Sequence, residues 1–316
     1  MILEACGSDN PAPGPAQAAR GDQTAGRWRM LERKAHTLDD RGGRRRLSYL
    51  EAGAGQDGVP VLCVHGMTRN ARDFERLAPA LARTRRVICV DLPGRGDSDR
   101  LADSTRYQIP TYAGDLLALL DALGIAEVDW VGTSLGGMIG MAVAGAEDTA
   151  VRGVIRRLVL NDIGPFIPKA ALARIGEYVV RTWRFESLAH AEAHVRKAYA
   201  PFGLRSDSDW RRLTELSVQP DADGGLIQNY DPAIGDDMRE RAPTDVDLWP
   251  AWDRIRCPVL VLRGADSDVL PAEVAAEMTR RGPGAEVAAF AGIGHAPALL
   301  DDDQISVVAE WLARPA

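Results

Sequence analysis

The sequence has no excess of positive charge, few cysteines and no long apolar run, and each absence narrows its function. The formal net charge is −7, and no stripe of Lys and Arg alternates with aromatic residues, so nucleic acid is not an expected partner. No segment approaches the roughly 20 apolar residues of a spanning helix, so no membrane association is expected. The four cysteines lack paired spacing, which favours a reducing cytoplasm.

The chain is long enough to bury a large core. It has 316 residues, of which 46% are hydrophobic, and α/β proteins of this length often form one domain with an insertion. Residues 1–26 are rich in Ala, Pro, Gly and Asp without periodicity. Such a segment cannot bury enough apolar area to offset the entropy of ordering, so we expect a flexible leader.

Short apolar runs alternate with amphipathic stretches through most of the remaining chain. The runs resemble strands buried on both faces, and the stretches between them have helical periodicity. This alternation predicts an α/β fold with a mostly parallel, doubly wound sheet and helices on both faces. Strands are expected at 28–38, 45–52, 59–64, 86–91, 128–132, 155–160 and 259–262, and helices at 71–82, 112–123, 135–146, 272–281 and 304–313.

The alternation stops between about 166 and 250. Helical periodicity continues there without strands, and aromatic residues gather, which indicates an inserted helical lid. We therefore expect the first part of the core at 27–165, the lid at 166–250 and the second part of the core at 251–316.

Ser134 is the strongest candidate for a catalytic residue. The segment Gly132-Thr133-Ser134-Leu135-Gly136 lies where an apolar strand meets a predicted helix, which is the context of a nucleophile elbow. The two glycines leave room where strand and helix side chains would collide. A serine at a helix N-terminus also lies among free backbone N–H groups that can stabilise a developing oxyanion.

Two further motifs support this interpretation. A buried strand ends in His65-Gly66-Met67, and the next is followed by the Asp-Leu-Pro-Gly-Arg-Gly-Asp-Ser loop at 91–98. Together with the elbow they resemble the α/β-hydrolase family, which implies an eight-stranded sheet. The resemblance also implies that the N–H groups of Met67 and Leu135 form the oxyanion hole. His295, on a Gly-rich loop before the closing helix, matches the family's general base and suits proton transfer near neutral pH.

Three carboxylates compete to hold the imidazole of His295. We favour Asp268, because the resemblance places the acid after the strand at 259–262. The common family spacing lands on Ser267, so Asp266 is also a candidate. Asp162 follows the strand at 155–160, where some family members carry their acid.

A serine nucleophile favours acyl transfer. We expect Ser134 and His295 to hydrolyse a small carboxylic ester or lactone through an acyl-enzyme, as a carboxylesterase-like enzyme with no metal or organic cofactor. Arg69 and Asn70 are candidates for contacts with a substrate carboxylate, and Phe166 is the lid residue expected closest to the pocket. The chain is expected to be a monomer or homodimer.

Three other functions remain open from the sequence. The first is serine-dependent hydrolysis of a C–C bond or an enol-lactone in aromatic catabolism. The second is a cofactor-free perhydrolase or haloperoxidase. The third is non-catalytic ligand binding on the same fold.

Overall fold

The computed structural model of the protein describes residues 31–40, 43–240 and 242–315. The expected leader at 1–26 and the start of the first expected strand lie outside the described residues. No helix in the described part of the chain is long and apolar enough to cross a membrane.

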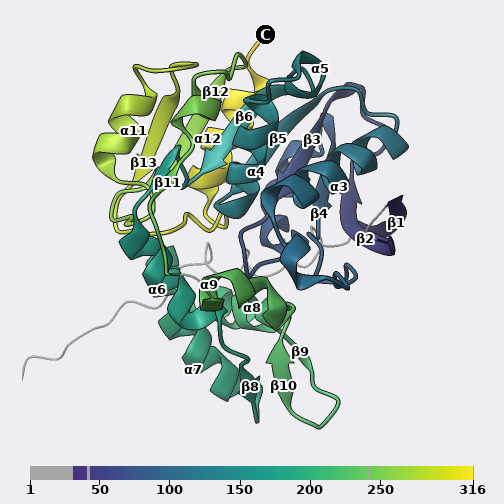
Figure 1. The fold of residues 1–316 in the computed structure, drawn as a ribbon, viewed down its shortest axis with the longest axis vertical. Coiled ribbons are helices and arrows are strands. Elements are labelled where there is room, and N and C mark those ends of the chain that lie inside the picture. The colour runs from purple at the N-terminus through teal and green to yellow at the C-terminus, as the bar shows by residue number, and fades with distance from the viewer. Residues whose placement is uncertain (1–30, 41–42, 241, 316) are drawn as a thin grey trace, which may run out of the picture.

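A central sheet of eight strands organises the fold (Figure 1). Its spatial order is β1-β2-β4-β3-β5-β6-β12-β13. The strands are β1 (Glu32–Asp40), β2 (Gly43–Ala52), β3 (Gly58–Val64), β4 (Arg85–Val90), β5 (Val128–Thr133), β6 (Ile155–Asn161), β12 (Val259–Gly264) and β13 (Glu286–Phe290).

The sheet is mostly parallel, as expected from the sequence. Strand β2 pairs antiparallel with β1 and with β4, and every neighbouring pair from β4 to β13 is parallel. The carboxyl ends of these parallel strands therefore meet at one edge of the sheet, where open α/β sheets bind their ligands.

Helices cover both faces of the sheet. On one face lie α3 (Ile109–Ala122), α4 (Leu135–Ala144) and α11 (Ala272–Met278), and on the other lie α2 (Leu77–Leu81) and α12 (Asp302–Ala313). Because strand side chains alternate between faces, Leu62 and Val64 pack into the first core while Val61 and Cys63 pack into the second.

The helical insertion lies beyond one end of the sheet (Figure 1). Its helices are α6 (Lys169–Val179), α7 (Leu188–Ala198), α8 (Asp207–Ser217) and α9 (Asp236–Glu240). We expected no strands here, which is wrong. Two small sheets are present, formed by β7 (Phe166–Ile167) with β11 (Val246–Asp247) and by β8 (Arg184–Phe185), β10 (Leu226–Gln228) and β9 (Val218–Pro220). Strands of two or three residues are too short to produce a hydrophobic period.

Other expected elements differ in detail. Strand β13 was missed because it is a largely exposed edge strand with two central alanines, and so lacks an apolar run. The expected helix at 71–82 is divided into a 3-10 turn, Ala71–Phe74, and the short helix α2. The remaining short helices are α5 (Thr149–Arg152) and α10 (Trp249–Trp252), with further 3-10 turns at Ser104–Arg106, Ala200–Phe202 and Pro232–Gly235.

Candidate active site

Ser134 sits in a strained turn between β5 and α4. Its backbone has φ 50° and ψ −112°, a region that residues with a side chain rarely adopt. A Cβ atom at Gly136 would lie 2.0 Å from the carbonyl oxygen of Val64, and one at Gly132 would lie 2.4 Å from the Gly136 carbonyl. Both glycines are therefore required for the close approach of strand and helix that presents the Ser134 hydroxyl at the carboxyl edge.

His295 connects Ser134 to a buried carboxylate. Its Nε2 lies 2.9 Å from Ser134 Oγ, and its Nδ1 lies 2.8 Å from Asp162 Oδ2. With the Nδ1–H tautomer the imidazole donates to Asp162 and accepts from the Ser134 hydroxyl. The Asp162 side chain is fully buried and that of His295 is 10% exposed, so water competes little for these bonds.

Asp162 is fixed by groups from the neighbouring strand. The Gly264 N–H donates to its Oδ1 over 2.7 Å, and the Ser267 hydroxyl donates to its Oδ2 over 2.5 Å. The backbone of Asp162, directly after β6, has φ 55°. These constraints aim the carboxylate at His295.

The preference for Asp268 as the partner of His295 is corrected by this geometry. Asp268 is exposed and forms a two-bond ion pair with Arg174 of α6, at 2.6 and 2.8 Å. Asp266 is also exposed. The loop after β12 instead turns Ser267 inward, and its hydroxyl reaches the carboxylate that comes from β6.

Met67 and Leu135 both border the cavity in front of Ser134. Leu135 is the first residue of α4, where N–H groups have no acceptor within the helix. Met67 belongs to the loop after β3, and a Cβ at the adjacent Gly66 would lie 3.7 Å from the Ser134 Cβ. This loop therefore lies against the nucleophile.

His65 holds that loop in place through hydrogen bonds. Its Nδ1–H donates to the Gly66 carbonyl over 2.7 Å, and its Nε2 accepts from the Leu92 N–H over 3.0 Å. Complete burial lowers the pKa of His65 to about 3, so the ring stays neutral near pH 7. Its bonds fix the loop backbone and leave it no role as a base.

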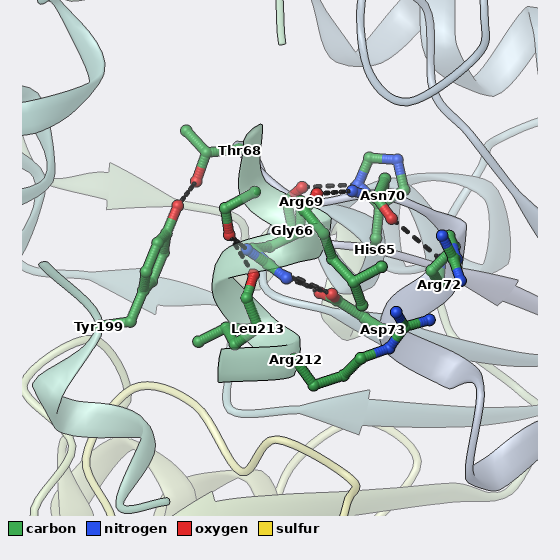
Figure 2. Close-up of polar contacts among 12 residues, drawn as sticks. His65, Gly66, Thr68, Arg69, Asn70, Arg72, Asp73, Tyr199, Arg212 and Leu213 are labelled. Atoms are coloured by element: carbon green, nitrogen blue, oxygen red, sulfur yellow. Dashed lines mark hydrogen bonds and ion pairs between the residues drawn. The ribbon is translucent and has the colours of Figure 1, made fainter. Parts of the chain in front are cut away.

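Arg69 faces the cavity but is bound to other side chains (Figure 2). Its Nη2 donates to Asp73 over 2.6 Å and its Nη1 to Ser217 Oγ over 2.5 Å. Burial alone would lower the pKa of Arg69, but the Asp73 carboxylate outweighs burial and raises it. Arg69 is therefore a permanently charged link between the loop after β3 and α8.

Two other pocket candidates lie away from the cavity lining. Asn70 caps the turn at 71–74 by accepting from the Arg72 N–H, and its amide donates to the Leu216 carbonyl over 2.8 Å. Phe166 lies in β7, and its neighbour Ile167 borders the cavity instead. Neither Asn70 nor Phe166 is among the lining residues.

Asn161 is a site residue that sequence analysis missed. Its side-chain Nδ2 donates to Thr133 Oγ1 over 3.0 Å and to the Pro297 carbonyl over 2.8 Å. Its backbone carbonyl accepts from the Ser134 N–H over 3.0 Å. One fully buried side chain thus joins the segments that carry Ser134, Asp162 and His295. The sequence did contain a signal for Asn161, because it is a polar residue at the end of a strand whose immediately preceding residues are apolar.

The helical insertion contributes tyrosines as well as apolar groups to the cavity lining. The hydroxyl of Tyr199 lies 2.9 Å from Thr68 Oγ1, which joins the helical insertion to the loop after β3 (Figure 2). Tyr178 meets Tyr199 edge to face at 6.1 Å between ring centroids. The other apolar residues of the wall include Met138, Ile163, Ile167, Leu172, Ile175, Leu213, Leu216, Met238 and Val269.

Comparison with known proteins agrees with this architecture. The family model described as the alpha/beta hydrolase fold matches residues 59–302. The chain belongs to this family. A structure of an alpha/beta hydrolase from Novosphingobium aromaticivorans is 36% identical, with a TM-score of 0.81 over 90% of this chain and 99% of that one.

Two curated relatives of this α/β hydrolase are hydrolases. The 3-hydroxybutyrate-oligomer hydrolase of Cupriavidus necator is 37% identical over 279 residues, which cover 85% of this chain and 93% of the relative. The 2-(acetamidomethylene)succinate hydrolase of Mesorhizobium japonicum is 31% identical over 255 residues, which cover 80% of this chain and 86% of the relative.

Proposed function

We propose that this α/β hydrolase is a serine esterase that cleaves small carboxylic esters or lactones through an acyl-enzyme. The observation that carries the proposal is the hydrogen-bonded chain Ser134–His295–Asp162 at the carboxyl edge of the sheet. This is the arrangement of nucleophile, base and orienting acid that acyl transfer needs.

In the proposed reaction, Ser134 Oγ attacks the ester carbonyl carbon while its proton passes to His295 Nε2. The N–H groups of Met67 and Leu135 donate to the oxyanion of the tetrahedral intermediate. His295 then protonates the leaving alcohol as the carbon–oxygen bond breaks. In the second half, water gives its proton to His295 and attacks the acyl carbon. The bond from the acyl carbon to Ser134 Oγ then breaks, His295 returns the proton to Oγ, and the carboxylic acid leaves. The buried Asp162 carboxylate stabilises the imidazolium formed in each half.

The relatives support an ester as the bond cleaved. The relative at 37% identity is named for hydroxybutyrate oligomers, whose units are joined by esters. We therefore extend the proposal to short oligomers of hydroxy acids. A second candidate is hydrolysis of a C–C bond, favoured by 25% identity over 242 residues to the 2-hydroxymuconate semialdehyde hydrolase of Pseudomonas putida.

We infer a cytoplasmic location from the described cysteines, which are unpaired even where Cys63 faces Cys89 across β3 and β4.

The test is hydrolysis of p-nitrophenyl esters with acyl chains of two to twelve carbons and of linear 3-hydroxybutyrate dimers. We expect turnover of short esters, none by Ser134→Ala, and covalent labelling of Ser134 by a fluorophosphonate. Faster turnover of a dienoic ketone than of any ester would favour C–C hydrolysis. Halide oxidation with peroxide in acetate as the main activity would favour a perhydrolase, and an unlabelled Ser134 with no turnover would favour ligand binding alone.

A further inference from the structure

The cavity in front of Ser134 is lined by five arginines, which fall into two groups. Three lie between β3 and α2 and one lies on α8, and each forms an ion pair with a carboxylate that also lines the cavity. These pairs are Arg69 with Asp73, Arg72 and Arg212 with Glu75, and Arg76 with Asp209. At that end of the cavity, each arginine therefore has a counter-ion that lines the cavity with it, and Arg72 and Arg212 share Glu75.

Arg174 is the fifth arginine, and its position differs. It lies on α6, and its partner Asp268 is absent from the described residues that line the cavity. Arg174 thus borders the cavity while its counter-ion does not. Ile163, after β6, and Val269, after β12, border the cavity beside it, so this end lies on the β6–β12 side of Ser134.

The ion pair leaves donors of Arg174 available. Nε and Nη2 hold the two oxygens of Asp268, and no bond from Nη1 is found among the described residues. A guanidinium has five N–H donors in a planar fork and can bind a second carboxylate along its other edge. Burial acts to lower the pKa of Arg174, but Asp268 outweighs it and raises the pKa, so the fork stays charged.

The pair lies near the reacting groups. Burial would raise the pKa of Asp268, yet Arg174 lowers it, and Arg174 borders the same cavity as Ser134 and His295. The cavity wall at this end is otherwise largely apolar, with Leu172, Ile175 and Met238 contributing from the lid. A cation in such surroundings attracts an anion more strongly than it would in water.

We propose that Arg174 forms a carboxylate subsite, so that the substrate is a small ester carrying a free carboxylate at the β6–β12 end of the cavity. The inference rests on the proposed esterase function and narrows its substrate class. Nη1 would donate to the substrate carboxylate while Asp268 holds the other edge of the fork. The other four arginines lack this asymmetry, because their counter-ions line the cavity with them.

The test compares the linear 3-hydroxybutyrate dimer as a free acid with its methyl ester. Affinity is measured as KM where the compound is cleaved, and otherwise as the constant for competitive inhibition of p-nitrophenyl butyrate hydrolysis. Wild type should bind the free acid more tightly. Arg174→Gln should weaken binding of the free acid by about tenfold to a hundredfold, the range for a hydrogen bond to a charged group, and leave the methyl ester nearly unchanged.

Arg196 supplies a matched control. Its side chain is 35% exposed, like that of Arg174, and it forms comparable ion pairs with Glu192 and Asp207 on the lid, but it does not line the cavity. Arg196→Gln should leave the ratio of affinities unchanged. Arg174→Lys should recover part of the preference because it keeps the charge.

The outcomes separate this inference from the function on which it rests. Equal affinity of wild type for acid and methyl ester, or an equal loss for both in Arg174→Gln, overturns the carboxylate subsite alone. Absence of p-nitrophenyl butyrate turnover, together with no labelling of Ser134, overturns the esterase function and the subsite with it.

Discussion

Replacing each candidate acid by its amide tests the site most directly. Asp162→Asn puts an NH₂ or a weaker acceptor at 2.8 Å from His295 Nδ1. An amide that donates there forces the proton onto Nε2, so the imidazole can no longer accept from Ser134. In Ser-His-Asp proteases the same change lowers kcat by about 10⁴-fold, which corresponds to about 5 kcal/mol. We expect a loss of about 10³- to 10⁴-fold here.

Asp268→Asn should have a far smaller effect on a neutral ester. It removes an ion pair between half-exposed side chains, and such pairs contribute at most about 1 kcal/mol, or about fivefold in a rate. The assay is kcat on p-nitrophenyl butyrate for both variants, with circular dichroism to confirm folding. A larger loss in Asp268→Asn than in Asp162→Asn would refute the assignment.

Two further predictions concern groups around the triad. Unfolded His65 takes up a proton below pH 6.5, whereas folded His65 stays neutral down to about pH 3. The free energy of unfolding should therefore decrease as the pH is lowered from 6.5 to about 3. Denaturant titrations should show a slope up to about 1.4 kcal/mol per pH unit steeper for wild type than for His65→Gln, and equal slopes would contradict this. Asn161→Ala should cost about 1–3 kcal/mol of stability and lower kcat with little change in KM, because it unties the segments around Ser134 and His295. A change in KM alone would argue against that role.

Most of the central sheet could be predicted because its strands are buried on both faces. Strands such as β3 and β12 have continuous apolar runs, and this feature is local in sequence. The exposed edge strand β13 has no such run. The strands of two or three residues in the insertion are too short to give a hydrophobic period, and β7 with β11 and β8 with β10 pair across distant parts of the chain.

The site residues also differ in whether local sequence predicts them. Ser134 could be located from its sequence because the elbow needs glycines at fixed offsets, and those offsets are visible. The partner of His295 could not, because the choice depends on how the ends of β6 and β12 face each other. Gly264 and Ser267, both from the β12 side, donate to Asp162, and this convergence arises only after the strands pair.

This geometry implies that the acid can be moved from one strand to the other. Ser267 Oγ lies 2.5 Å from Asp162 Oδ2, the same oxygen that meets His295 Nδ1, so a carboxylate at 267 would approach the same imidazole nitrogen. We expect Ser267→Asp to raise the kcat of the Asp162→Asn variant at least tenfold on p-nitrophenyl butyrate, because a carboxylate again favours the Nδ1–H tautomer. Ser267→Asn in the same background is the control and should restore nothing, since it supplies bulk without charge. If both double variants recover equally, the loss in Asp162→Asn reflects packing, and the role of Asp162 in orienting His295 is refuted.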